Sequence, residues 1–209
     1  MAGLFITFEG GEGSGKSTQA KRLAEHLRGL GRTVVLTREP GGTEQGEAVR
    51  NLLVNGDPRR WSATAEALLN YAARDAHVRD LIRPALARGD LLISDRFMDS
   101  TRAYQGYAGQ CPMSLIDGLE RQVVGPTTPQ LTLIFDLDPA VGLARAKARG
   151  AGVEDRYERN GLVFHQALRQ GFLAIAKAHP ARCKIIDAGG TEQAVQAAVL
   201  KAFELTQHG

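Results

Sequence analysis

The segment GGEGSGKST constrains the fold of this chain more than any other feature of the sequence. It satisfies the pattern G-x-x-x-x-G-K-[ST], follows the apolar run LFITFE, and precedes a helical apolar stripe of Ala20, Leu23, Ala24 and Leu27. Glycines allow positive φ and close approach of the backbone, so that successive N–H groups and a helix N-terminus can face phosphate oxygens. The pattern therefore predicts a phosphate-binding loop between a strand and a helix.

Two side chains of this loop carry chemistry that a glycine-rich turn alone would lack. Lys16 is expected to bridge the β- and γ-phosphates of a nucleotide, and the Ser17 hydroxyl is expected to bind Mg²⁺. The backbone N–H groups around them would surround the phosphates. The predicted nucleotide-binding residues are Gly10, Gly11, Glu12, Gly13, Ser14, Gly15, Lys16, Ser17 and Thr18.

Short apolar runs alternate with helix-length segments along the chain. The expected strands are nearly continuous in apolar and β-branched residues, as in a parallel sheet that helices cover on both faces. We therefore expect one α/β domain over residues 1–209, with ligands beyond the carboxyl ends of the strands. The expected strands cover residues 4–9, 33–37, 91–95, 131–137 and 184–188, and the expected helices cover 15–29, 44–54, 62–88, 114–124, 139–149, 159–178 and 191–206.

The composition excludes some classes of protein. Hydrophobic residues make up 43% and charged residues 23% of the 209 residues, which is typical of a globular rather than a disordered chain. A net charge of +3 suits small anionic ligands as well as nucleic acid and decides little between them. Cys111 and Cys183 lack a CxxC spacing and are expected to be reduced thiols. The N-terminus lacks signal-peptide features and no apolar run could span a bilayer, so we expect a cytoplasmic protein without a membrane partner.

The phosphate loop does not name a function, because switches, motors, transporters and kinases share it. A regulatory GTPase needs an Asn-Lys-x-Asp signature, and no asparagine of this chain precedes a lysine. Helicase and transporter ATPases usually need a longer chain. A small kinase acting on a nucleotide or a nucleoside remains the favoured interpretation. A nucleotide-dependent switch with a protein partner is the alternative from another class.

A second informative stretch, LLISDRFMDSTRAYQGY, begins with an expected strand. Asp95 ends that strand, where a carboxylate could reach Mg²⁺ or its water shell. Arg96 follows at once, and its planar guanidinium suits an acceptor phosphate. The segment TREPGG also follows an expected strand, so we expect it to form part of a substrate site.

The combination of FEGGEGSGKS, TREPGGT, NYAAR and DRFMDSTRAYQGY closely resembles the bacterial thymidylate kinases, in order and over nearly the whole chain. The resemblance implies the P-loop NTPase fold, with a five-stranded parallel sheet and a mobile lid at about residues 145–160. It implies transfer of a phosphoryl group from ATP to thymidine monophosphate with Mg²⁺, for dTTP synthesis. It also implies a homodimer, with no nucleic-acid partner; Ala65, Leu68, Leu69 and Ala72 could serve such a dimer or the core equally well.

The resemblance implies how the acceptor nucleotide is held. Arg74 should reach the thymine ring and Arg96 the monophosphate, which Arg38 and Arg50 would border. These phosphate-directed arginines favour a nucleoside monophosphate over a nucleoside as the acceptor. They therefore weigh against a deoxynucleoside kinase, which is the nearest alternative among enzymes.

Other positions follow from the same resemblance. Thr101 and Gln105 would be polar contacts to the base, and Tyr104 would lie against the sugar. Glu12 would accept a hydrogen bond from the 3′-hydroxyl of the acceptor, and Pro40 matches a proline that is often cis in the family.

One position departs from the family pattern. The family places an aromatic ring that stacks on thymine four residues before the base-reading arginine, or in some members three. Four residues before Arg74 stands Asn70, which cannot stack, and three before stands Tyr71. Tyr71 is therefore the expected stacking ring, with packing within its helix as the alternative.

A second departure concerns the catalytic arginine. Some relatives carry it inside the phosphate loop, where this chain has Gly13. The basic, glycine-containing segment ARAKARGAGVEDRYERN suits a lid that closes over ATP. In relatives whose phosphate loop lacks this arginine, the resemblance implies that the lid supplies it. Arg149 matches that lid arginine, and Arg156 is a supporting candidate. The expected catalytic residues are Lys16, Asp95, Arg96 and Arg149.

Overall fold

The computed structural model describes residues 3–57, 59–148 and 156–207. The strands are β1 (Leu4–Gly10), β2 (Val34–Arg38), β3 (Leu91–Asp95), β4 (Leu131–Asp136) and β5 (Cys183–Asp187). The helices are α1 (Lys16–Gly29), α2 (Glu44–Val54), α3 (Ala63–His77), α4 (Arg83–Ala87), α5 (Met98–Thr101), α6 (Met113–Val123), α7 (Pro139–Ala148), α8 (Leu162–Ala178) and α9 (Glu192–Gln207), with π-helical turns η1 (Val78–Ile82) and η2 (Arg102–Ala108). No helix within these ranges is long and apolar enough to cross a membrane.

The strands form one five-stranded sheet in the order β2-β3-β1-β4-β5, and every neighbouring pair is parallel. In the register of the central strand, Ile6 lies opposite Ile93 of β3 and Leu131 of β4. All five carboxyl ends therefore meet at one edge, where the loops after β1, β2 and β3 converge. The predicted sheet is confirmed.

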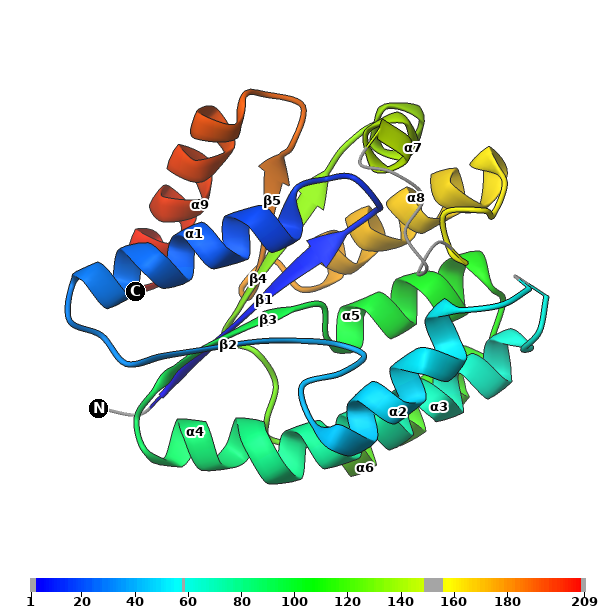
Figure 1. Ribbon diagram of the computed structural model, residues 1–209, viewed down its shortest axis with the longest axis horizontal. Coiled ribbons are helices and arrows are strands. Elements are labelled where there is room, and N and C mark those ends of the chain that lie inside the picture. The colour runs from blue at the N-terminus through cyan, green and yellow to red at the C-terminus, as the bar shows by residue number, and fades with distance from the viewer. Residues whose placement is uncertain (1–2, 58, 149–155, 208–209) are drawn as a thin grey trace.

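Helices cover both faces of the sheet (Figure 1). Ile6 and Phe8 of β1 pack with α1 and α9 on one face, in a cluster that includes Leu23 and Val199. Phe5, the residue before Ile6, points to the opposite face, where α3, η1, α4 and α6 cover it. This alternation is the period-two geometry of a strand, and burial on both faces explains why the strands read as continuous apolar runs.

The structure differs from the sequence-based prediction in the stretch after β3. Residues 98–108 form α5 and η2, a helical segment that was not predicted. Its sequence MDSTRAYQGYA lacks a 3.6-residue apolar stripe because several of its inward-facing side chains are polar. Asp99, Thr101 and Gln105 are all buried there. The predicted helix over 62–88 is α3 and α4 joined by the π-helical turn η1.

Candidate active site

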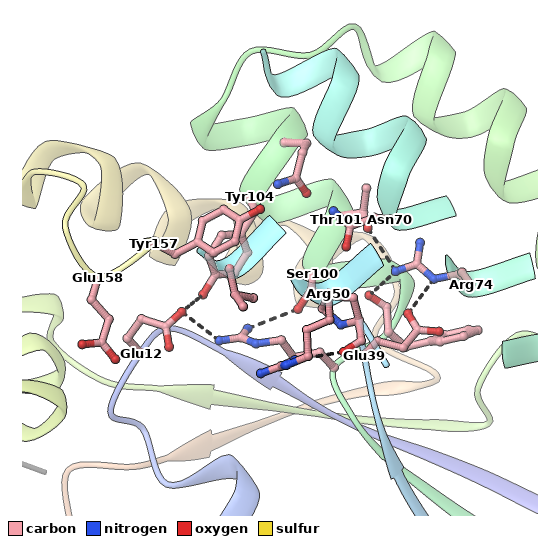
Figure 2. A pocket seen from close by; sticks show the side chains of 15 residues that line it. Glu12, Glu39, Arg50, Asn70, Arg74, Ser100, Thr101, Tyr104, Tyr157 and Glu158 are labelled. Atoms are coloured by element: carbon pink, nitrogen blue, oxygen red, sulfur yellow. Dashed lines mark hydrogen bonds and ion pairs between the residues drawn. The ribbon is translucent and has the colours of Figure 1, made fainter. Parts of the chain in front are cut away.

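Two cavities meet at the carboxyl edge of the sheet. The first, here called the loop cavity, is lined by residues 12–18 of the phosphate loop, by residues 36–39 at the end of β2, and by Asp95. The second, here called the deep cavity, extends between α3 and α5–η2 and is drawn in Figure 2. Both cavities are lined by Glu12, Glu39, Arg50 and Arg96. Groups bound in the two cavities would therefore meet across a wall of two carboxylates and two guanidinium groups.

The phosphate loop has the backbone conformation that its glycines allow. Gly13 and Gly15 have φ angles of 66° and 86°, which place them in the left-handed region. Lys16 is buried, and its Nζ donates to the Gly11 carbonyl at 2.6 Å and to Ser14 Oγ at 3.2 Å. Burial and the nearby charge of Arg96 lower the pKa of Lys16 to about 8. The ammonium group of Lys16 thus folds back onto the phosphate loop.

The loop leaves no room for a side chain at position 13. A Cβ built at Gly13 would collide with the carbonyl of Gly142 on α7, and a Cβ at Gly142 would collide with the carbonyl of Glu12. The backbone of α7 thus packs directly on the phosphate loop. This contact gives a physical reason for the glycine that stands where some relatives carry an arginine.

Ser17 and Asp95 lie together in the loop cavity, where the Ser17 hydroxyl donates to Asp95 Oδ2. Mg²⁺ takes oxygen ligands and is usually held by one or two carboxylates together with substrate phosphates. The described parts of the chain contain no group of three or more His, Cys, Asp or Glu that could hold a metal without such help. This hydroxyl and carboxylate fit a magnesium ion that a nucleotide brings with it.

Arg96 has an unusual backbone conformation, and three hydrogen bonds hold its side chain. Its φ of 71° is unusual for a residue with a Cβ, and such outliers concentrate at functional sites. Nη1 donates to the Gly10 carbonyl at 2.9 Å and to Ser100 Oγ at 3.2 Å, and Nη2 donates to Glu12 Oε1 at 3.0 Å. The guanidinium is thereby held between the phosphate loop and α5, in the wall that both cavities share.

Glu12 points into this wall, where Oε1 accepts from Arg96 and from the Tyr104 hydroxyl at 2.5 Å. Burial alone would raise the pKa of Glu12, but the charges of Arg96 and Lys16 and the Tyr104 hydrogen bond hold it at about 2. The carboxylate therefore stays ionised beside the phosphate loop, in contact with the deep cavity.

Arg74 is buried in the wall of the deep cavity with one donor unused (Figure 2). Its Nε donates to Glu39 Oε2 at 2.8 Å, and its Nη2 donates to the Phe97 carbonyl and to Thr101 Oγ1, both at 3.0 Å. Nη1 is buried and has no hydrogen-bond partner among the described residues. A buried donor without a partner costs about 1–3 kcal/mol, which a ligand with an acceptor atom would recover.

The structure does not place Tyr71 in the deep cavity. Its side chain is 2% exposed and is absent from the lining, and its ring packs against the Arg74 guanidinium at 4.5 Å. Asn70 is the residue that lines the cavity, and its Nδ2 donates to the Glu66 carbonyl one turn earlier. One residue along a helix turns the side chain by about 100°, so only one of these neighbours can face the cavity.

The remaining acceptor-side predictions lie at or near the deep cavity. Thr101, Tyr104 and Gln105 line it, and Gln105 Nε2 donates to Glu66 Oε2 at 2.8 Å. Arg38 instead lines the loop cavity and pairs with Glu47 at 2.9 Å.

The segment after β2 contributes Glu39 and Pro40 to the lining of the deep cavity. The peptide bond between Glu39 and Pro40 is cis, as the resemblance implied. Arg50 Nη1 donates to the Pro40 carbonyl at 2.9 Å.

The predicted lid arginines have different positions. Arg149 lies outside the described residues. Arg156 is 1% exposed and binds Glu66, the Leu53 carbonyl at 2.9 Å and the Asp57 carbonyl at 3.0 Å. This places its guanidinium among α2 and α3 and outside the lining of the loop cavity. The contacts are those of a residue that ties the segment before α8 to α2 and α3.

Sequence reasoning missed several residues of the deep cavity. Tyr157 and Glu158 line it, and the Tyr157 ring meets Tyr104 edge-on at 5.4 Å. Both positions lie in the segment that is predicted from the sequence to form a lid over ATP, so a place beside the acceptor was not expected of them. Glu39 has no role of its own in the sequence-based prediction for TREPGG, although a carboxylate that directly follows a strand of this sheet is a recognisable signal.

Comparisons with known proteins agree with one another. A family model described as thymidylate kinase matches residues 8–199. A thymidylate kinase of Caulobacter vibrioides is 56% identical over 197 residues, which cover 94% of each chain. One of Dinoroseobacter shibae is 52% identical over 198 residues, covering 95% of each. The crystal structure of thymidylate kinase from Ehrlichia chaffeensis matches with a TM-score of 0.77 and 38% identity, over 97% of this chain and 99% of that one.

Proposed function

The chain belongs to the thymidylate kinase family, and we propose that it transfers the γ-phosphoryl group of ATP to thymidine monophosphate, giving thymidine diphosphate and ADP. The observation that carries this proposal is the shared wall of the two cavities, formed by Glu12, Glu39, Arg50 and Arg96. A donor bound at the phosphate loop and an acceptor bound in the deep cavity would present their phosphates to each other there.

The donor side would work by positioning and charge neutralisation, which is what phosphoryl transfer requires of a protein. The N–H groups of residues 10–18 would surround the phosphates of ATP, and Lys16 would exchange its contact with the Gly11 carbonyl for the β- and γ-phosphates. Ser17 and Asp95 would hold Mg²⁺ directly or through its water shell. The ion supplies charge compensation for the phosphate oxygens when bound.

On the acceptor side, the monophosphate would meet Arg96, with Arg50 and Arg38 at its border. The guanidinium of Arg96 is already oriented by the Gly10 carbonyl and by Glu12, so little ordering is left for the moment of binding. No side chain needs to act as a strong base, because the attacking phosphate oxygen is itself anionic.

The nucleoside would lie deeper in the same cavity. Arg74 Nη1 is the donor that suits a carbonyl of the thymine ring, and Thr101 and Gln105 would contact the base nearby. Glu12 would accept from the 3′-hydroxyl, and Tyr104, held by its bond to Glu12, would lie against the sugar. We propose no stacking contact for Tyr71, whose ring supports Arg74.

We also propose that the chain is a single domain with a lid at about residues 145–160, and that Arg149 supplies positive charge to the transition state. An arginine finger contributes about 10³–10⁵ in rate in other nucleotide enzymes. Arg149→Ala is expected to lower kcat by at least about tenfold with a modest change in KM. A near-normal kcat would remove Arg149 from this role.

A homodimer and a cytoplasmic location complete the proposal. The exposed face of α3 supports the dimer: Leu68 is 48% exposed, Ala72 is also exposed, and Ala65 and Leu69 are only partly buried. These side chains therefore contribute little to the hydrophobic core and form an apolar surface that a second copy of the chain could cover. Sedimentation equilibrium would test the dimer. Cys111 and Cys183 are free, as suits a reducing compartment.

The experiment that tests the function measures ADP formation from ATP and Mg²⁺ with a panel of acceptors. The panel contains thymidine monophosphate, deoxyuridine monophosphate, deoxycytidine monophosphate, other nucleoside monophosphates and thymidine. A strong preference for thymidine monophosphate is expected. A preference for thymidine would make the chain a nucleoside kinase, and slow hydrolysis that no acceptor accelerates would refute the acceptor site.

A further inference from the structure

A chain of buried hydrogen bonds lies behind the base end of the deep cavity. His77 is 0% exposed, one turn after Arg74 on α3, and makes two contacts with the carboxyl end of β2 and the residue after it. Its Nδ1 lies 2.8 Å from Glu39 Oε1, and its Nε2 lies 2.8 Å from Thr37 Oγ1. Glu39 Oε2 accepts from Arg74 Nε at 2.8 Å. Four side chains are thus joined in one line that ends at the cavity.

The chemistry of these groups gives the bonds a direction. A carboxylate can only accept, so the imidazole must donate from Nδ1 to Glu39. A neutral ring then has Nε2 as an acceptor, and the Thr37 hydroxyl can donate to it. Each donor in the line therefore faces an acceptor. The exception is Arg74 Nη1, a donor that remains available to a ligand.

The backbone of the loop after β2 covers the Thr37 end of the line. A Cβ built at Gly42, where φ is +81°, would lie 2.5 Å from Thr37 Oγ1 and 2.6 Å from His77 Nε2. Glu39 is 5% exposed and Arg74 is 2% exposed. If His77 were lost, a largely buried carboxylate oxygen of Glu39 would lack its donor, and the carboxylate would be free to turn together with the Arg74 guanidinium that it holds.

We propose that His77 is a positioning residue for base selection: by holding Glu39, it aims Arg74 Nη1 so that the acceptor cavity takes a base with a carbonyl at this edge and rejects one with an amino group. This inference rests on the proposed function. A cytosine base would present an N–H donor to the N–H of Arg74, and a site that expects an acceptor discriminates strongly against such a partner.

The kinetic test compares three replacements of His77. In His77→Asn the amide nitrogen stands at the same number of bonds from the backbone as Nδ1, so the donor to Glu39 is kept. In His77→Gln the amide stands where Nε2 was, and in His77→Phe both nitrogens are lost. We measure kcat/KM for thymidine monophosphate relative to deoxycytidine monophosphate, with His179→Asn as the control at an exposed histidine.

The expected result is a loss of about tenfold in this ratio for His77→Gln and His77→Phe, because Arg74 Nη1 would no longer be oriented to donate one hydrogen bond to the base. His77→Asn should keep the ratio within about threefold of the native protein, and KM for ATP should change little in all three. Equal losses for both nucleotides, or equal behaviour of the Asn and Gln variants, would reduce His77 to a packing residue and overturn the inference. If the native protein itself does not prefer thymidine monophosphate, the proposed function fails instead.

A second measurement needs neither turnover nor a variant that folds. The ¹⁵N shifts of the His77 ring in the native protein report which nitrogen carries the proton. A proton on Nδ1 is expected. A neutral ring protonated only at Nε2 could not donate to Glu39 and would overturn the inference whatever the kinetics show.

Discussion

A methyl group added at Gly46 should disturb the acceptor site without unfolding the protein. Gly46 is buried in the first turn of α2 and faces the TREPGG segment. A Cβ at this position would lie 2.6 Å from the Gly41 carbonyl oxygen and 2.9 Å from its carbon. An ordinary carbon–oxygen contact is about 3.3 Å, so the segment that carries Glu39 and Pro40 must move by about 0.7 Å.

This displacement has a larger effect on binding geometry than on stability. Overpacking costs about 1–3 kcal/mol, and replacing glycine by alanine within a helix returns about 1 kcal/mol, so Gly46→Ala should lose at most about 2 kcal/mol of unfolding free energy. A misplacement of about 1 Å can cost about 10²-fold in rate. Since Glu39 holds Arg74 and the Pro40 carbonyl holds Arg50, we expect kcat/KM for thymidine monophosphate to fall at least about tenfold.

The assay is steady-state ADP formation, together with urea denaturation to measure the unfolding free energy. Gly118→Ala is the matched control, because it lies within α6 and a Cβ there meets only the end of the Arg121 side chain, at 4.0 Å. The control should keep its activity and gain up to about 1 kcal/mol. A Gly46→Ala protein whose kcat/KM stays within about twofold of the native value would refute the reasoning.

Three further expectations concern charge. Arg156→Met leaves the buried Glu66 without its cation, so the unfolding free energy in urea should fall by about 3 kcal/mol; an unchanged denaturation midpoint would contradict the role of Arg156 as a structural tie. Burial and the charge of Asp99 raise the pKa of Glu9 from 4.5 to about 8, so unfolding releases a proton within this window and stability falls as pH rises through it. The Tm of Glu9→Gln relative to the native protein should therefore climb from about pH 4.5 to about pH 8 and then level off, and a flat difference would assign Glu9 an ordinary pKa. Asp95→Asn should raise the Mg²⁺ concentration for half-maximal activity by about tenfold, and an unaltered Mg²⁺ dependence would remove Asp95 from the metal site.

Local sequence patterns were sufficient for the sheet, most helices and the phosphate loop. Each of these features depends on residues close together in the chain: the continuous apolar runs of the strands, the glycines of GGEGSGKS, and caps such as Ser62, whose side chain accepts from the Ala65 N–H at the start of α3. The helical segment over 98–108 escaped prediction because its inward face is polar, so that the usual apolar period is missing.

The partners of the charged side chains could not be read from the sequence. Glu39 and Arg74 are 35 residues apart, and Arg156 and Glu66 are 90 apart. Which of these groups meet depends on how α3 packs against the loop after β2 and on where the chain returns after α7. An arginine that looks like a lid residue in the sequence is therefore a buried tie in the structure.

The same reason separates Asn70 from Tyr71. A helical pattern shows that adjacent residues point in different directions, but it does not show which of these directions faces the cavity. The packing of α3 against α5 and η2 turns Asn70 towards the ligand space and Tyr71 beneath Arg74. Short-range patterns thus specify the backbone and its phosphate loop, because hydrophobic period and glycine content act locally. The identity of the side chains that meet a substrate depends on contacts between distant segments, which form only when the helices pack on the sheet.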